Sequence, residues 1–170
     1  MERKLAEPSA AKTGIVSTGH QQVFAYWSSL RTEGRLPCRA QLDPHHLKQL
    51  LPTVSLIDVV RQNGVVRYRQ RLAGTGLYSV YGREITGRSL DDVYPADEAG
   101  YWREQLDKVV AEGRPTVGCQ TVSARPGGAC SILWIRLPLA SDGRSVDMIL
   151  GYDTPMSAPI SRMATGIRAA

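Results

Sequence analysis

Residues that commonly build cofactor, metal and disulfide sites are scarce in this chain of 170 residues, which contains three cysteines, three histidines and one phenylalanine. Cys38, Cys119 and Cys130 are odd in number and form no C-x-x-C pair, which argues against a disulfide framework and favours reduced thiols. His45 and His46 are neighbours, and successive residues of a helix point about 100° apart, so they make a poor metal-binding pair. We therefore predict no metal site.

Long apolar runs and targeting signals are also missing. No stretch is long enough to span a bilayer, and the opening MERKLAEPSAAKTG has no apolar central region of the kind found in secretory signals. These two absences favour a cytoplasmic protein.

The motifs of common catalytic sites are absent as well. The chain has no Gly-x-x-x-x-Gly-Lys-Ser/Thr loop, no Gly-x-Ser-x-Gly elbow, and no histidine in the predicted sheet region that could act as a base. The glycines of GRSLDD and LAGTG are better explained as turn residues. We predict no catalytic residue.

The formal net charge of +5 is not gathered in the body of the chain. Residues 1–35 carry five basic and three acidic side chains (+2), and residues 155–170 carry two arginines and no acidic residue (+2). Residues 36–154 carry fourteen basic and thirteen acidic side chains (+1). A nucleic-acid-binding protein concentrates its positive charge on a face or groove, so binding through the basic tails is only an alternative.

The first part of the chain reads as a tail followed by two helices. Residues 1–17 have little apolar content and are expected to be disordered. Ser17 or Thr18 can cap a helix over residues 18–33, and Asp43-Pro44 is a second helix-start signal. The first helix is amphipathic, with apolar residues three and four positions apart: Val23, Tyr26, Trp27 and Leu30.

Two β-rich segments flank Asn63-Gly64, a pair that prefers a tight type I′ hairpin turn because both positions need positive φ. A helix from Asp97 to Glu112 follows, because its apolar residues recur at helical spacing. The last predicted elements are three strands at about 115–124, 131–140 and 145–153, and a disordered tail over 155–170.

One domain over residues 18–154 accounts for this order of elements: helix, short helix, two strands, short helices, long helix and three strands. Runs of strands separated by a helical block give an α+β fold with an antiparallel sheet. A doubly wound parallel sheet would need strand and helix to alternate, and they do not.

This order resembles a PAS domain, in which two strands, a cluster of short helices, a long helix and three more strands form a five-stranded antiparallel sheet. The segments EGRLPCRAQLDP, SLIDV, YRQRLAGT, YGREITGRSLDD and LPLASDGR look like a bacterial subfamily of short, single-domain PAS proteins, over about residues 22–153. The resemblance implies a helical cluster on one face of the sheet and the amphipathic N-terminal helix beside it. It implies sensing, small-molecule binding or regulated protein interaction, and no particular reaction, because the subfamily is largely without an assigned activity.

The cofactors of other PAS domains find little support in these residues. Haem-binding PAS domains often place a histidine on or beside the long helix, and residues 97–112 contain none. Flavin-binding photosensor PAS domains share an Asn-Cys-Arg-Phe-Leu-Gln run that this chain lacks; Cys38 precedes Arg39 but lies before the first strand. The cofactor is therefore unknown, with haem and flavin disfavoured.

A pocket between the sheet and the helical cluster is the first candidate site. Aromatic and apolar walls with a few hydroxyls suit a small ligand, although the same side chains can simply fill the core. Arginines there can contact an anionic ligand or form ion pairs, Arg39 with Asp43 and Arg71 with Asp91 or Asp92. The candidate pocket residues are Tyr78, Tyr81, Trp102, Leu106, Cys119, Leu133, Tyr152, Arg39 and Arg71.

The outer face of the sheet is the second candidate site. Ile132 and Trp134 are expected there, opposite Leu133, and an exposed tryptophan is unusual in a monomer. The N-terminal helix could cover its own sheet or that of a second subunit, which favours a homodimer. The candidate interface residues are Val23, Tyr26, Trp27, Leu30, Ile132 and Trp134.

The leading hypothesis is a cytoplasmic, non-enzymatic sensory module of bacterial signalling that binds a small molecule, a protein partner or both. Its tails are too short for a kinase, a cyclase or a DNA-binding unit, so its output would come from a separate protein. The alternatives are a small-molecule enzyme that uses the same cavity, with Asp58 or Tyr81 as acid or base, and nucleic-acid binding through the basic tails.

Overall fold

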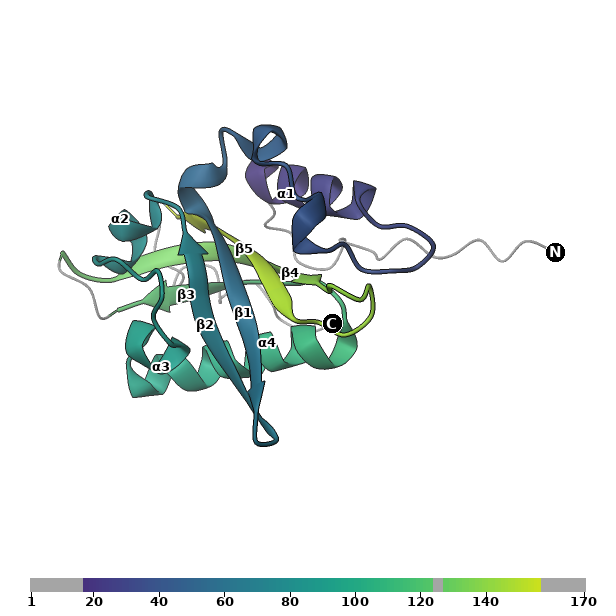
Figure 1. The fold of residues 1–170 in the computed structure, drawn as a ribbon. Coiled ribbons are helices and arrows are strands. Elements are labelled where there is room, and N and C mark those ends of the chain that lie inside the picture. The colour runs from purple at the N-terminus through teal and green to yellow at the C-terminus, as the bar shows by residue number, and fades with distance from the viewer. Residues whose placement is uncertain (1–16, 124–126, 157–170) are drawn as a thin grey trace, which may run out of the picture.

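Five strands form one antiparallel sheet in the computed structural model, which describes residues 17–123 and 127–156 (Figure 1). The strand order across the sheet is β2-β1-β5-β4-β3, so the first and last strands of the chain are neighbours, and β2 and β3 are the edges. Every pair of neighbouring strands is antiparallel. The predicted α+β fold with a five-stranded antiparallel sheet is confirmed.

The helical elements precede, interrupt and support this sheet. The helices are α1 (Thr18–Ser29), α2 (Leu77–Tyr81), α3 (Leu90–Val93) and α4 (Ala96–Glu112), with 3-10 turns η1 (Arg39–Gln41), η2 (Pro44–Leu47) and η3 (Leu51–Thr53). The strands are β1 (Val54–Gln62), β2 (Val65–Ala73), β3 (Thr116–Val122), β4 (Cys130–Leu139) and β5 (Met148–Pro155).

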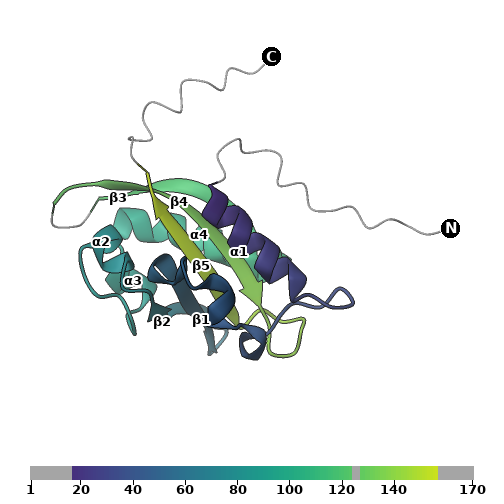
Figure 2. The same cartoon turned by 90° about the horizontal axis from the view of Figure 1, so that it is seen from above.

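The helices α1 and α4 lie on opposite sides of the sheet (Figure 2), and each face of the sheet carries its own hydrophobic core. On the first, which we call the α4 face, the side chains of α2, α3 and α4 pack against strand residues that include Ile132 and Trp134. On the second, the α1 face, Val23 and Trp27 of α1 pack against strand residues that include Leu137. Among the strands, α1 lies mainly over β4 and β5.

Local sequence signals explain where several elements begin and end. The turn between β1 and β2 has φ of 51° at Asn63 and 76° at Gly64, as the predicted type I′ hairpin requires. Oγ of Ser17 caps α1 by accepting from the backbone N–H of His20. Gly113, with φ of 60°, ends α4 in the left-handed conformation.

Two helix boundaries differ from the prediction. α1 ends at Ser29 and not near residue 33, because the chain turns back through a bridge between Thr32 and Arg35, with positive φ at Glu33 and Gly34. α4 begins at Ala96, one residue before the predicted start at Asp97, and Pro95 occupies the N-cap position.

The predicted disordered tails lie outside the described residues except at their inner ends. Ser17 caps α1, and Pro155 is the last residue of β5, so these two positions are ordered parts of the domain. Within the described ranges, no helix combines the length and the apolar character that crossing a bilayer requires.

Candidate functional site

Arg136 interrupts an otherwise apolar strand. β4 reads CSILWIRLPL, and it is buried at every position from Ser131 to Leu139. Because side chains alternate between the faces of a strand, Leu137 lies on the α1 face and Arg136 on the α4 face, where Arg136 is 1% exposed. A guanidinium in this position needs a partner, because its removal from water is costly.

Asp153 on β5 supplies that partner. Nη1 of Arg136 donates to Oδ1 of Asp153 over 2.6 Å, and both side chains are 2% exposed. The other carboxylate oxygen, Oδ2, accepts a hydrogen bond of 2.8 Å from Oη of Tyr81 on α2. Oη of Tyr94, which follows α3, donates to Oη of Tyr81 over 3.2 Å. A buried chain of polar groups thus links the central sheet to the helical cluster.

Aromatic rings enclose the guanidinium. Cζ of Arg136 lies 4.9 Å from the ring centroid of Trp102 and 5.6 Å from that of Trp134, within the range of cation–π attraction. The ring of Tyr94 stacks on Trp102 with a centroid distance of 5.2 Å. We call these six residues the Arg136 cluster: Tyr81, Tyr94, Trp102, Trp134, Arg136 and Asp153.

Two glycines on neighbouring strands make room for these large side chains. Gly151 pairs with Arg136 across the sheet, and a Cβ atom there would lie 2.4 Å from Oγ of Ser55 and 3.2 Å from Nη1 of Arg136. Gly118 pairs with Trp134, and its Cβ atom would lie 2.7 Å from the indole ring. A side chain at Gly118 would displace the Trp134 ring, and one at Gly151 would displace Ser55 and crowd Arg136, so glycine suits both positions.

Burial and charge shift the pKa values of the cluster. Burial, followed by the Asp153 carboxylate, raises the pKa of Tyr81 well above its ordinary value, and burial also raises the pKa of Tyr94. Burial lowers the pKa of Arg136, but Asp153 and the two phenols raise it by more, so the net shift is upward. At neutral pH the guanidinium therefore stays charged and both phenols stay protonated, and neither tyrosine provides a phenolate base.

A cavity of about 10 Å³ adjoins the cluster. Three of the residues around it carry a buried polar atom that has no partner among the described residues, namely Oε1 of Gln70, Nε1 of Trp102 and Nε of Arg136. Most buried polar atoms in proteins are hydrogen-bonded, so three exceptions around one cavity single it out as the candidate site. The cavity is lined by Ile57, Tyr68, Gln70, Leu90, Tyr94, Trp102, Leu106 and Arg136.

The structure brings three of the nine predicted pocket residues to this region, because Tyr81 belongs to the cluster and Trp102 and Leu106 line the cavity. Tyr78 is 58% exposed, and both Arg39 and Arg71 are exposed.

The placement of the other three predicted pocket residues was wrong. Tyr152 belongs to the core of the α1 face, and Cys119 pairs with Leu133, one position away from Trp134 and therefore on the α1 face too. The physical reason is the period of two in a strand: an error of one position moves every side chain to the opposite face.

Other ion pairs replace the two that were predicted for Arg39 and Arg71. Asp43 is 2.9 Å from Nδ1 of His45, and Arg71 lies 3.6 Å from Asp58 on the adjacent strand and not at the aspartates of α3. Asp58 also pairs with Arg69 at 3.0 Å. Because Asp58 lies on the α1 face, its position does not suit the acid–base role considered for it in the cavity.

The outward face assigned to Ile132 and Trp134 was also wrong. Ile132 is 0% and Trp134 1% exposed, and both belong to the core of the α4 face. Val23 and Trp27 are buried by the chain's own sheet, and Nε1 of Trp27 donates to the carbonyl of Pro138 over 2.8 Å. α1 therefore covers its own sheet. Homodimerisation remains a prediction, but these four residues offer it no exposed surface.

Motif and periodicity reasoning does not reach the polar half of the site, which consists of Gln70, Tyr94, Arg136 and Asp153. A signal for two of them was present, since Arg136 and Asp153 are charged residues inside the apolar segments ILWIRLPL and MILGYDTP. A charge within a buried strand is rare unless it is paired, so two such strands predict an ion pair between them.

Solved structures of Light-Oxygen-Voltage (LOV) domains have a similar fold. A LOV protein of Rhodobacter sphaeroides is 15% identical, with a TM-score of 0.51, and the match covers 73% of this chain and 74% of that chain. The dark structure of the blue-light photoreceptor Aureochrome1 LOV is 17% identical, with a TM-score of 0.51, over 70% of this chain and 86% of that chain. At these identities the likeness shows the fold alone.

The family comparison reaches further than the structural one. No curated protein matches the chain as a relative. The family model described as a PAS domain, however, matches residues 15–153, which include the four α-helices, the Arg136 cluster, strands β1 to β4 and β5 as far as Asp153. By this match and by its five-stranded sheet, the chain belongs to the PAS domain family.

Proposed function

We propose that the chain is a sensory module that binds a small neutral molecule at the Arg136 cluster and passes the bound state to a partner through α1. The observation that carries the proposal is a set of three polar atoms, on Gln70, Trp102 and Arg136, that surround one cavity and have no partner in the described part of the chain. A ligand with a hydrogen-bond acceptor for the two N–H groups and a donor for the amide oxygen would satisfy all three.

Charge balance favours a neutral ligand over an anion. The carboxylate of Asp153 already compensates the guanidinium of Arg136 at 2.6 Å. A bound carboxylate would leave one negative charge without compensation in a buried site, which is costly. A small amide or lactam adds no charge, and its planar group suits the stacked rings of Tyr94 and Trp102.

A flavin, which the likeness to LOV domains suggests, does not fit the residues present. Sites for ligands of drug size measure several hundred Å³, whereas about 10 Å³ is open here, room for about one water molecule. Trp102, Trp134 and Tyr94 occupy the space between α4 and the sheet. A ligand larger than water has to move these side chains, and this requirement couples binding to a conformational change.

The sheet itself supplies the path from the cluster to α1. Arg136 is flanked in β4 by Ile135 and Leu137, which pack in the core under α1, and Asp153 follows Tyr152, which lies under the start of that helix. A Cβ atom on Gly19 of α1 would lie 2.2 Å from Oη of Tyr152, so the helix and the ring are in close contact. A change in the Arg136–Asp153 pair therefore acts on strands that hold α1 directly.

The test uses a panel of small neutral amides, ureas and lactams and their matched carboxylates, with thermal unfolding as the readout. Native mass spectrometry of the purified protein first shows whether it retains a small molecule. At ten times its Kd, a neutral ligand should raise Tm by about 3–5 °C, since such binding stabilises by about 1.4 kcal/mol. The matched carboxylate should have little effect.

Gln70→Leu is the informative variant, because it removes an unpartnered oxygen and should leave the ligand-free protein as stable as before. It should lose the response to neutral ligands. Gln120→Leu is the matched control, because Gln120 also belongs to a strand and does not line the cavity. The proposal is wrong if no neutral compound raises Tm and the protein retains no ligand, or if Gln70→Leu responds like the wild type.

A further inference from the structure

Part of the α1 face is left open over the first hairpin. Among the strands, α1 lies mainly over β4 and β5, and the β1–β2 hairpin extends beyond the helices that flank the sheet (Figure 1). Three of the five exposed large apolar residues of the described chain lie here: Val60 is 37%, Val65 51% and Leu72 45% exposed. Val60 and Val65 lie near the turn and Leu72 near the other end of β2, so exposed apolar side chains occur along the length of this surface.

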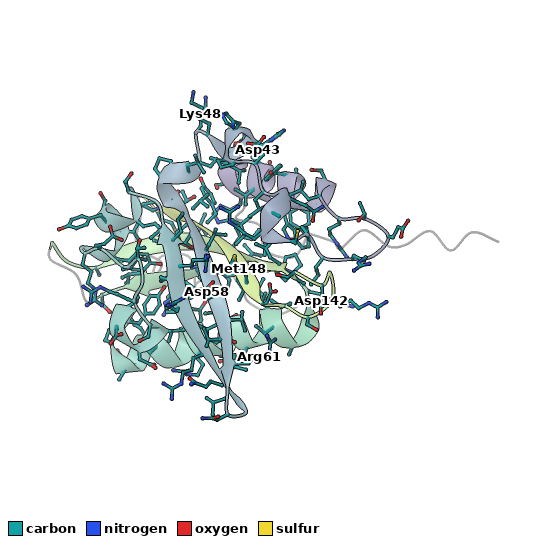
Figure 3. All side chains as sticks on the ribbon, viewed as in Figure 1. Asp43, Lys48, Asp58, Arg61, Asp142 and Met148 are labelled. Carbon is teal, nitrogen blue, oxygen red and sulfur yellow. The ribbon has the colours of Figure 1, made fainter. Side chains whose placement is uncertain are left out.

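Arginines accompany these apolar residues. Arg67, Arg69 and Arg71 of β2 are all exposed, and Arg67 pairs across the hairpin with Val60. Asp58 is the acidic residue among them, and it pairs with Arg69 at 3.0 Å and with Arg71 at 3.6 Å. Figure 3 shows Asp58 midway along the hairpin. Three guanidiniums and one carboxylate leave this surface with a charge of +2.

The opposite side of the molecule has the opposite charge. Residues 90–112, which span α3 and α4, contain seven acidic and two basic side chains, a net charge of −5. Over residues 36–154 as a whole the net charge is only +1, with fourteen basic and thirteen acidic residues. The hairpin is thus a local basic surface on a nearly neutral domain, and it is suited to steering one kind of partner.

We propose that the hairpin surface, formed by Val60, Val65, Arg67, Arg69, Arg71 and Leu72, docks an acidic amphipathic segment of a separate protein. Arginine beside exposed aliphatic side chains is the composition of protein interfaces, in which guanidiniums pair with carboxylates while apolar groups are buried. The inference goes beyond the ligand site and does not depend on it, because the surface lies on the other face of the sheet.

The same observations disfavour nucleic acid and a second copy of the chain as the partner of this surface. Single-stranded nucleic acid binds through aromatic stacking and uninterrupted positive charge, whereas this surface has no aromatic residue and carries Asp58 in the middle. A second copy docked through the same surface would oppose arginine to arginine, which is repulsive. An acidic amphipathic segment offers both carboxylates for the arginines and apolar side chains for the exposed aliphatic residues of the hairpin surface.

The test is a selection of displayed random peptides on the full chain, with counter-selection on the Arg67→Gln/Arg71→Gln variant. This variant keeps the Arg69–Asp58 pair and so protects the fold. We expect the enriched peptides to combine several acidic residues with apolar ones. By fluorescence anisotropy they should bind the variant at least about tenfold more weakly than the wild type, because two charge-assisted contacts are lost.

Arg114→Gln/Arg144→Gln is the matched control, because it removes two exposed arginines that form no ion pair within the described residues. It should change the affinity by less than about twofold. Asp58→Asn should tighten binding, since it frees Arg69 and Arg71. The inference fails if the enriched peptides have no acidic bias or if both double variants lose affinity equally. It also fails if the hairpin variant instead loses binding to a single-stranded oligonucleotide or self-association in sedimentation.

Discussion

The two cores on either side of the sheet differ in kind. Under α1 the sheet contributes mainly aliphatic residues, and the helix adds Val23 and Trp27. Under α4 the sheet contributes the Arg136–Asp153 pair, and beside it are three polar atoms without a partner in residues 17–123 and 127–156. The same two strands, β4 and β5, supply both faces. The α1 face is therefore mainly apolar, whereas the α4 face combines an apolar core with buried charges that are tolerated because they are paired.

The largest effect should come from breaking the charged pair. Arg136→Met leaves Asp153 buried without its charge partner, so the free energy of unfolding should fall by about 3–5 kcal/mol in a urea titration. The double variant Arg136→Met/Asp153→Leu removes both charges and should recover most of that loss. If the single variant loses less than about 1 kcal/mol, the pair does not control the stability of this core.

The adjacent position in β4 gives the matching test of the other core. Leu137 is 0% exposed on the α1 face, and Leu137→Ala should lower the free energy of unfolding by about 2–4 kcal/mol through lost burial and a cavity. The loss should appear in urea titrations, while ligand-induced Tm shifts persist. If Leu137→Ala abolishes the ligand response as well, the two faces do not have the separate roles described above.

The α1 face should also be sensitive to pH through His20, which is 1% exposed and has no partner for Nε2 within the described residues. Burial, together with the charge of Arg136, lowers its pKa from 6.5 to about 4 against an opposing effect of Asp153. The pKa of His20 is lower in the folded state than in the unfolded state, so neutral His20 favours folding. Its contribution to the free energy of unfolding is complete above pH 6.5 and is lost as the pH falls towards 4.

Between pH 7.5 and pH 4.5, the free energy of unfolding should therefore fall by about 1–3 kcal/mol more in the wild type than in a His20→Phe variant. Urea titrations of both proteins at the two pH values measure the difference, and the variant corrects for carboxylates that titrate in the same range. Equal losses in the two proteins would show that His20 is not responsible.

The smallest effect concerns the hydrogen bond from Tyr81 to Asp153 on the α4 face. Tyr81→Phe should lower the free energy of unfolding by about 1–2 kcal/mol, because one oxygen of a buried carboxylate loses its donor. Tyr78→Phe is the matched control on the same helix, and since Tyr78 is 58% exposed it should be nearly neutral in urea titrations. If the two substitutions change the free energy of unfolding equally, the hydrogen bond from Tyr81 to Asp153 does not stabilise the cluster.

Local signals predicted most of the fold. Asn63-Gly64 forms its hairpin turn, Asp43 caps η2 by accepting from His45, and Gly113 ends α4, because each depends on backbone chemistry within a few residues. The Glu104–Lys108 ion pair of 2.7 Å is equally local, because both residues belong to α4 and lie four positions apart.

The candidate site was less accessible to sequence reasoning. The alternation of side chains along β4 correctly places Leu133 and Trp134 on opposite faces of the sheet. It does not show which of the two faces is covered by the long helix. The face of β4 depends on where α1 and α4 pack, which involves residues more than a hundred positions apart, such as Trp27 and Pro138. Tyr81, Trp102 and Leu106 lie on the α4 face as expected, because each belongs to the apolar side of a helix, and their role in ligand binding stays a prediction.

Patterns along the chain were thus sufficient for the order of elements, the antiparallel sheet and the PAS resemblance, since turns, caps and periodicity are local. The placement of Arg136 beside Asp153, the glycine gaps at Gly118 and Gly151, and the open hairpin surface arise only when distant strands pair and helices cover them. The physical reason is that a buried charge or an open face is defined by what surrounds it, and those surroundings come from packing across the sheet.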